Sequence, residues 1–171
     1  LWNRSQAGLD RAAALIRSNQ SALVAAGRLS ADDSNALMER IVPTTEDACF
    51  PTASFLLESI AEDLTLKQDF FRRISTLVPV DCILTTNTSG LSISAIGSTV
   101  AEPGRFCGMH WINPPHLVPL VEVIQGTDTG DGTMDFVYAL AQRLRKKPIR
   151  AKDLPGFIMN RLQLALLREA L

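Results

Sequence analysis

The chain has 171 residues, a net charge of −1 and 46% hydrophobic residues, which is typical of one soluble globular domain with a sizeable core. The basic residues form no stripe with interleaved aromatic residues, so we expect no nucleic-acid partner, and the apolar runs are too short to span a membrane. Cys49, Cys82 and Cys107 form no CxxC pair. We expect them to be reduced core residues of a cytoplasmic protein.

Helical patterns dominate the first forty residues. Leu1-Trp2 is interpreted as the tail of a strand. Apolar residues at helical spacing predict a helix over residues 6–26, with Gly27 as its stop. Ser30 followed by Asp33 predicts an N-cap with an acid at N3, so a second helix should cover residues 31–40. Ile41-Val42 is a candidate short strand.

From residue 53 onward, short apolar runs alternate with amphipathic segments. We expect strands over 53–60, 82–86, 105–112, 120–124 and 148–151, helices over 64–78 and 130–145, and a new helix near 155–156. The first two strands should be buried and parallel, because they are continuously apolar. This alternation indicates an α/β fold with a mostly parallel sheet.

A domain boundary is expected at residues 153–157 (DLPGF). Residues 1–152 are interpreted as one domain, and residues 153–171 as a hinge and the first helix of another. The segment 158–171 is apolar around most of its circumference, and such a helix needs a partner surface. We therefore expect a second, helical domain that this chain lacks.

The glycines argue against a dinucleotide site when they are considered alone. A nucleotide-binding α/β protein should carry GxGxxG after its first strand, and no spacing among the ten glycines fits. The nearest arrangement, Gly126 with Gly130 and Gly132, follows a strand but lacks the pattern.

Three polar positions in apolar surroundings are candidate site residues. Asn87-Thr88-Ser89 lies at the end of a predicted strand, where open α/β sheets bind ligands, or is only a polar turn. His110 ends another strand and is either functional or a satisfied core histidine. Glu122 lies within an apolar strand, where an unpaired carboxylate is costly, unless that strand has a polar outer face.

Taken in order, the motifs NTSxLxI, HxxNPP, PLVEVI and DxPGFxxNRL closely resemble the L-3-hydroxyacyl-CoA dehydrogenase family. Residues 58–67 (ESIAEDLTLK) fit the family's preceding segment, so the resemblance covers nearly the whole chain. It implies a Rossmann-type domain followed by a helical dimerisation domain, and hence a homodimer when complete. On that template the chain begins at the end of the second strand and lacks the first βα unit with its glycine loop.

The resemblance implies roles for individual residues. His110 would take the proton of the substrate's 3-hydroxyl while hydride leaves for the nicotinamide, and Glu122 would orient His110 and stabilise its protonated form. The substrate would contact Ser89, Asn113 and Asn160. On the cofactor side lie Asn87, Glu62 and Lys67; for the last two, a charged helix start and a solvated lysine remain as alternatives.

Two departures from the family bear on ligand choice. Where the family usually carries an acid at the end of the second strand, this chain has Asn3-Arg4. Loss of the acid together with an arginine can accommodate a 2′-phosphate, so NAD and NADP both remain options, unless Arg4 is merely solvated. Asn19 and Ala26 replace a serine and a lysine directed toward the CoA nucleotide, which weakens the CoA assignment, although Arg28 could substitute.

The sequence thus favours hydride transfer between a 3-hydroxyacyl-CoA and NAD or NADP. A related dehydrogenase of a non-CoA 3-hydroxy acid, such as carnitine or a sugar acid, and a noncatalytic crystallin-like relative are the alternatives. The sequence also makes a geometric prediction. The segment between the strands of His110 and Glu122 centres near His116, so antiparallel pairing with symmetric register would place these two residues opposite each other.

Overall fold

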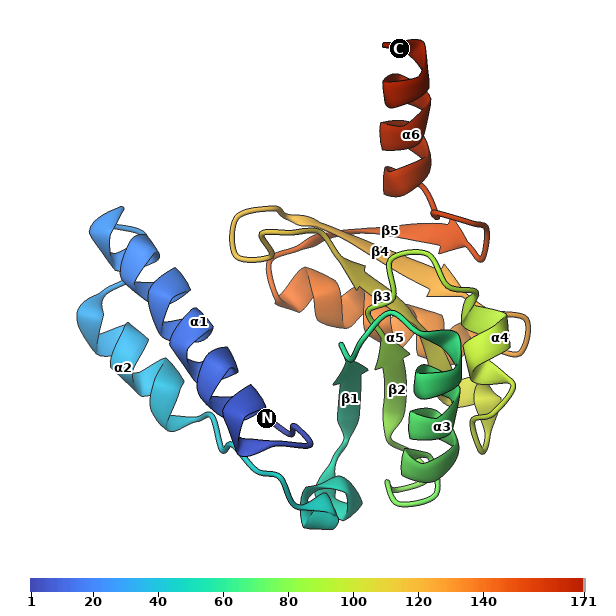
Figure 1. The fold of residues 1–171 in the computed structure, drawn as a ribbon, viewed down its shortest axis with the longest axis horizontal. Coiled ribbons are helices and arrows are strands. Elements are labelled where there is room, and N and C mark those ends of the chain that lie inside the picture. Colours follow the sequence, from blue (N-terminus) through green and yellow to red (C-terminus); the bar gives the residue numbers. More distant parts are fainter. Residues whose placement is uncertain (171) are drawn as a thin grey trace. The chain divides into compact units, whose positions relative to one another are not determined.

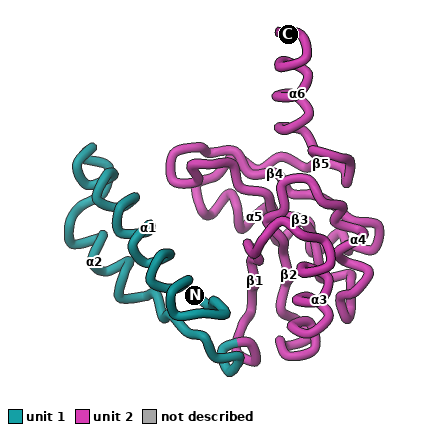
Figure 2. Tube along the Cα trace, viewed as in Figure 1, with its two compact units in different colours: residues 1–49 teal, residues 50–171 magenta. Residues whose placement is uncertain are grey.

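The computed structural model describes residues 1–170, which form two compact units, one of residues 1–49 and one that begins at residue 50 (Figure 2). The first unit is a pair of helices, α1 (Gln6–Ala25) and α2 (Ala31–Glu39). Gly27 has a φ of 66° just after α1, the left-handed conformation that commonly ends a helix. The two predicted helices and the stop between them are therefore confirmed.

Hydrogen-bonded caps begin both helices. The Ser5 hydroxyl accepts a bond from the N–H of Gly8 at 3.2 Å, and the Ser30 hydroxyl accepts one from the N–H of Asp33 at 3.0 Å. The short strand expected at Ile41-Val42 is wrong, because the bridge partner of Trp2 is Thr44 instead. The Leu1 ammonium donates to the Val42 oxygen at 2.9 Å, but the bridge forms at Thr44 and not at residues 41–42.

The second unit is built on a five-stranded sheet in chain order (Figure 1). Its strands are β1 (Phe55–Glu58), β2 (Ile83–Thr86), β3 (Phe106–Trp111), β4 (Leu120–Gln125) and β5 (Lys147–Lys152). All neighbouring pairs are parallel except β3 and β4, which are antiparallel. The predicted α/β fold with a mostly parallel sheet is confirmed. The expected burial of the first strand is not, because Leu57 of β1 is 38% exposed.

The helices of this unit are α3 (Leu64–Ile74), α4 (Ile93–Gly97), α5 (Asp131–Arg143) and α6 (Met159–Glu169), with a 3-10 turn at Pro103–Arg105. A second 3-10 turn, Asp47–Thr52, includes the last residues of the first unit and the first residues of the second. Helix α3 ends four residues before its predicted end, and α4 was not predicted. Helices α3 and α4 cover one face of the sheet and α5 covers the other (Figure 1). No helix within residues 1–170 is both long and apolar enough to cross a bilayer.

Alternation along β3 and β4 creates two apolar layers. On the α5 face, Cys107, Met109, Val121 and Val123 pack with α5 in one buried cluster. On the other face a Cβ at Gly108 would lie 2.8 Å from Ile93 Cδ1 and 2.9 Å from Ile124 Cδ1, so a larger residue there would displace both isoleucine side chains between α4 and the sheet.

Two of the three cysteines are core residues as expected. Cys82 and Cys107 are buried, whereas Cys49 is half-buried. Burial raises the pKa of the Cys107 thiol to about 12, so this side chain is a protonated apolar core group at neutral pH.

Helix α6 extends away from the sheet (Figure 1). None of its described residues is buried, and its four leucines are all more than half exposed: Leu162, Leu164, Leu166 and Leu167. The apolar residues of this helix therefore do not pack on the sheet of their own unit.

Candidate active site

The β3–β4 pairing brings His110 and Glu122 together. They are directly opposed in the antiparallel register, and His110 Nδ1 lies 2.7 Å from Glu122 Oε2. His110 is 5% exposed and Glu122 is fully buried. The predicted juxtaposition is confirmed, and the polar-outer-face alternative for Glu122 is wrong.

The remaining oxygen of Glu122 is held by the start of α6. Its Oε1 accepts hydrogen bonds from the backbone N–H groups of Ile158 and Met159, each at 2.9 Å. Burial raises the pKa of Glu122, but the hydrogen bonds from His110, Met159 and Ile158 outweigh it and leave the pKa below its ordinary value of 4.5. Glu122 is therefore a buried carboxylate at neutral pH, with both oxygens engaged.

This lowered pKa predicts a pH-dependent contribution of Glu122 to stability. A carboxyl whose folded-state pKa is depressed stabilises the fold above its unfolded-state pKa and loses that contribution as pH falls through the folded-state pKa. Glu122→Gln should therefore lower the free energy of unfolding most at about pH 7, and the deficit should shrink below about pH 4. Urea unfolding of both proteins across this range measures it; a deficit that is equal at every pH would contradict the assigned charge.

Ser89 and Asn160 also meet, although they are far apart in sequence. The Asn160 side-chain amide donates to the backbone oxygen of Ser89 at 2.7 Å, and Ser89 itself is exposed. Between β5 and Asn160, the buried ring of Phe157 lies 5.8 Å from the His110 ring, measured between centroids. Residues 157–160 thus connect the His110–Glu122 pair with the Ser89 turn.

Glu62 stabilises that turn from its other side. Its Oε1 accepts bonds from the Thr88 hydroxyl at 2.6 Å and the Ser89 N–H at 2.8 Å. Burial raises the pKa of Glu62, but the bonds from Thr88 and Ser89 and the charge of Lys67 lower it further, so the net shift is downward. The sequence did not predict this contact between Thr88 and Glu62. The Thr88 hydroxyl donates to Glu62 and accepts bonds from the N–H groups of Gly90 and Leu91.

Lys67 is not solvated; that alternative is wrong. Its side chain is 1% exposed, and its ammonium lies 2.6 Å from Glu58 Oε1 and 3.6 Å from Glu62 Oε2. Glu58 was missed by sequence reasoning, although the signal that marked Glu122, a carboxylate in an apolar strand, applies to it equally. The buried ion pair lies directly beneath the exposed carboxylate of Glu62.

The remaining predicted site residues are dispersed. Asn87 accepts a bond from the Trp111 N–H at 2.8 Å and so connects the ends of β2 and β3. Asn113 is exposed in the segment after β3, before a cis peptide to Pro114. Asn3 and Arg4 belong to the first unit, where the Asn3 side chain accepts from the Ser5 N–H at 3.1 Å and Arg4 is exposed.

Comparison of this sequence with known protein families and curated proteins identifies the family of the chain. Residues 1–154 match the family described as 3-hydroxyacyl-CoA dehydrogenase, NAD binding domain. The chain belongs to this family. It is 34% identical to the 3-hydroxybutyryl-CoA dehydrogenase of Clostridioides difficile, over 99% of this chain and 60% of that protein.

Solved structures agree with this membership of the 3-hydroxyacyl-CoA dehydrogenase NAD-binding domain family. The (S)-3-hydroxybutyryl-CoA dehydrogenase of Ralstonia eutropha is similar with a TM-score of 0.93 and 31% identity, covering 97% of this chain and 59% of that one. An NAD⁺-dependent dismutase, 5-formyl-3-hydroxy-2-methylpyridine 4-carboxylic acid 5-dehydrogenase, has a TM-score of 0.87 and 32% identity, covering 99% and 54%. The fold is therefore a Rossmann-like NAD-binding domain, and the chain spans 60% of the length of the 3-hydroxybutyryl-CoA dehydrogenases of Clostridioides difficile and Deinococcus radiodurans.

Proposed function

We propose that the complete gene product oxidises a 3-hydroxyacyl-CoA to its 3-keto form, or reduces it in reverse, with NAD or NADP. The buried His110–Glu122 pair at the carboxyl end of β3 carries this proposal. Because Glu122 is an ionised acceptor, the facing His110 Nδ1 carries a proton, which leaves Nε2 with the lone pair. This nitrogen is the general base for the 3-hydroxyl.

The proton and the charge have defined positions in this mechanism. His110 Nε2 takes the hydroxyl proton, and the imidazolium so formed is stabilised by Glu122, which stays ionised. Phe157 packs beside the imidazole. Ser89 and Asn160 orient the substrate, and the exposed Asn113 contributes a further amide donor. The reaction needs no other titrating group.

A dinucleotide fits the chemistry at the carboxyl ends of β1 and β2. Ligands of open α/β sheets bind at this edge, where Glu62 exposes a carboxylate. A carboxylate acceptor suits the carboxamide of a nicotinamide ring. At the same edge, Asn87 binds the Trp111 N–H, and the buried ammonium of Lys67 lies 3.6 Å from Glu62. The bound cofactor supplies the hydride acceptor.

Turnover by the complete gene product tests the proposal. Its kcat/KM should be higher for 3-hydroxybutyryl-CoA than for free 3-hydroxybutyrate, carnitine or a sugar acid. The non-CoA alternative is supported by the similarity to a dehydrogenase of a pyridine carboxylic acid, and a preference for a free acid would favour it. Dinucleotide binding without turnover of any substrate would instead support the noncatalytic alternative.

Arg4 is expected to favour NADP. It is exposed, whereas Asn3 is bonded to the start of α1, so the guanidinium is the group available to a 2′-phosphate. Asn3→Asp combined with Arg4→Ala should shift the ratio of kcat/KM for NADPH over NADH by about tenfold toward NADH, the effect of about 1.4 kcal/mol. Arg17→Ala, an exposed arginine on α1, is the matched control; an unchanged ratio in the double variant would make Arg4 a surface charge.

The domain boundary and the assembly complete the proposal. We assign residues 1–152 to the dinucleotide-binding domain and residues 153–171 to a hinge and the first helix of a helical domain. The exposed leucines of α6 support its burial in that domain and in a homodimer, because a helix with such an apolar surface needs a partner.

A further inference from the structure

Asp153, directly after β5, is tied to the start of α4 by four hydrogen bonds. Its carboxylate accepts from the Ser92 hydroxyl and the Ile93 N–H, each at 2.8 Å, and from the Ser94 N–H and hydroxyl at 2.8 and 2.6 Å. Burial raises the pKa of Asp153, but these bonds more than compensate and lower it below the usual range. The Asp153 carboxylate is thus ionised, and both of its oxygens accept hydrogen bonds from residues 92–94.

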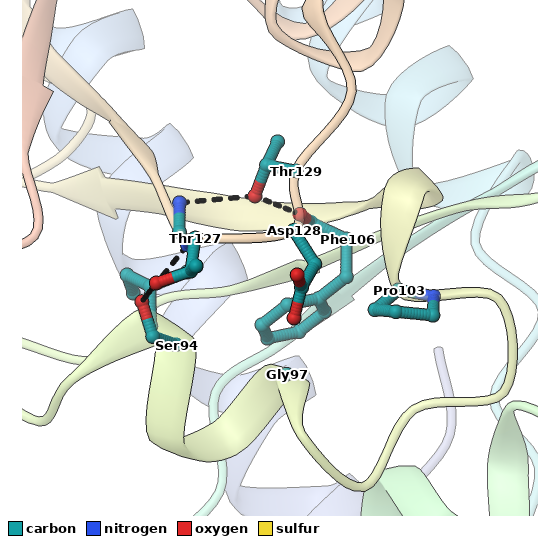
Figure 3. A pocket seen from close by; sticks show the side chains of 9 residues that line it. Ser94, Gly97, Pro103, Phe106, Thr127, Asp128 and Thr129 are labelled. Atoms are coloured by element: carbon teal, nitrogen blue, oxygen red, sulfur yellow. Dashed lines mark hydrogen bonds between the residues drawn. The ribbon is translucent and has the colours of Figure 1, made fainter.

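Ser94 extends this connection to the end of β4. Its hydroxyl accepts bonds from the Thr127 N–H at 2.9 Å and the Thr127 hydroxyl at 3.0 Å. Figure 3 shows Ser94 at the start of α4 facing Thr127, beside the small pocket that both residues line. Asp153 is therefore bonded directly to the start of α4 and, through Ser94, to the segment that follows β4.

Five residues beyond this anchor, the same segment reaches the catalytic pair. The N–H groups of Ile158 and Met159 bind Glu122, and Asn160 binds the backbone of Ser89. In between, Phe157 is buried at a φ of 47°. A non-glycine residue keeps this left-handed conformation only when its surroundings hold it.

We infer that Asp153 is a positioning residue for the reaction, because its bonds to α4 hold the first turn of α6 on Glu122. The same bonds fix the start of α4, only three residues after Ser89, so one carboxylate aligns both the catalytic pair and the substrate turn. Asp153 is not itself a catalytic residue. The kinetic part of this inference rests on the proposed function, whereas its structural part does not.

Loss of the anchor should free the two N–H groups from Glu122. Glu122 would then hold His110 less rigidly, and small misplacements of a catalytic group cost large factors in rate. We expect kcat to fall about tenfold or more in Asp153→Ala. The KM for the dinucleotide should change by less than about twofold, because Glu62 and the Ser89 N–H retain their own bond.

The experiment compares Asp153→Ala with two further variants in the complete gene product. Ser94→Ala removes one donor and should give a smaller change in the same direction, which keeps the test valid if Asp153→Ala folds poorly. Asp135→Asn is the matched control, since its carboxylate pairs with Arg150 on the surface. The measurements are amide hydrogen exchange at Ile158 and Met159, and kcat and the KM for the dinucleotide at saturating 3-hydroxybutyryl-CoA.

Exchange at both amides should rise about tenfold or more in Asp153→Ala and less in Ser94→Ala, with no change in Asp135→Asn. Unchanged protection at Ile158 and Met159 would overturn the positioning role, as would a kcat for Asp153→Ala equal to that of Asp135→Asn. If the unsubstituted protein turns over no hydroxyacyl substrate, the proposed function fails. Amide exchange still decides the structural inference in that case.

Discussion

Replacing His110 with glutamine is expected to lower kcat by a factor of about 10²–10⁴, the usual contribution of a positioned general base. Glutamine can still donate a hydrogen bond to Glu122, but it has no basic nitrogen for the substrate hydroxyl. Because His110 lies at the end of β3 and not in the Glu62–Ser89 cluster, the Kd for NADH should stay within about twofold. Steady-state kinetics and fluorescence titration with NADH provide the two measurements.

The only other histidine of the chain supplies the matched control. His116 lies between β3 and β4, and His116→Gln should leave kcat within about threefold. Glu122→Gln should also lower kcat, and the double variant His110→Gln/Glu122→Gln should be little worse than His110→Gln, because residues that act as a unit are not additive. Retention of full kcat in His110→Gln would exclude this residue as the base.

Lys67→Met is expected to lower the free energy of unfolding by about 3–5 kcal/mol. Methionine matches the volume of lysine, but it leaves the buried carboxylate of Glu58 without its cation. Glu58 would keep bonds from the Ile60 N–H and the Thr86 hydroxyl, both at 2.5 Å, yet an uncompensated buried charge is costly. Urea unfolding gives the free energy directly.

Two further variants separate charge from packing. Glu58→Gln combined with Lys67→Met removes both charges and should recover most of the loss, as replacement of whole buried pairs does. Arg72→Met breaks the exposed pair with Asp69 and should cost only about 0–1 kcal/mol. If Lys67→Met were no more destabilising than Arg72→Met, the buried pair would contribute nothing to folding.

Local patterns in the sequence were sufficient for most of the fold. Helical spacing and caps at Ser30 and Gly27 define the first unit, and the apolar runs identify all five strands. The His110–Glu122 contact was predictable because the two strands are separated by one short segment, which leaves few possible registers. Helix α4 was missed because its five residues follow a serine- and glycine-containing stretch that is equally typical of a turn.

The environment of each charged group was less predictable. Lys67 follows a helix cap and has the local pattern of an exposed lysine. Its burial depends on Glu58 from β1 and on Glu62, which only the folded chain brings to the same ammonium. Asp153 was interpreted only as part of a boundary, because its four donors lie about sixty residues earlier. Such assignments depend on tertiary packing, which periodicity does not encode.

The antiparallel register of β3 and β4 also has a consequence for divergence within the family. Side chains alternate between the faces of a sheet, so a one-residue slip would turn Glu122 toward α5 and place a valine opposite His110. Strand β4 is also paired with β5 at six positions, which opposes any slip. Insertions and deletions between β3 and β4 should therefore be absorbed at residues 112–119, where Asn113 lies. Residues of the proposed substrate site can therefore diverge there without displacing the His110–Glu122 pair.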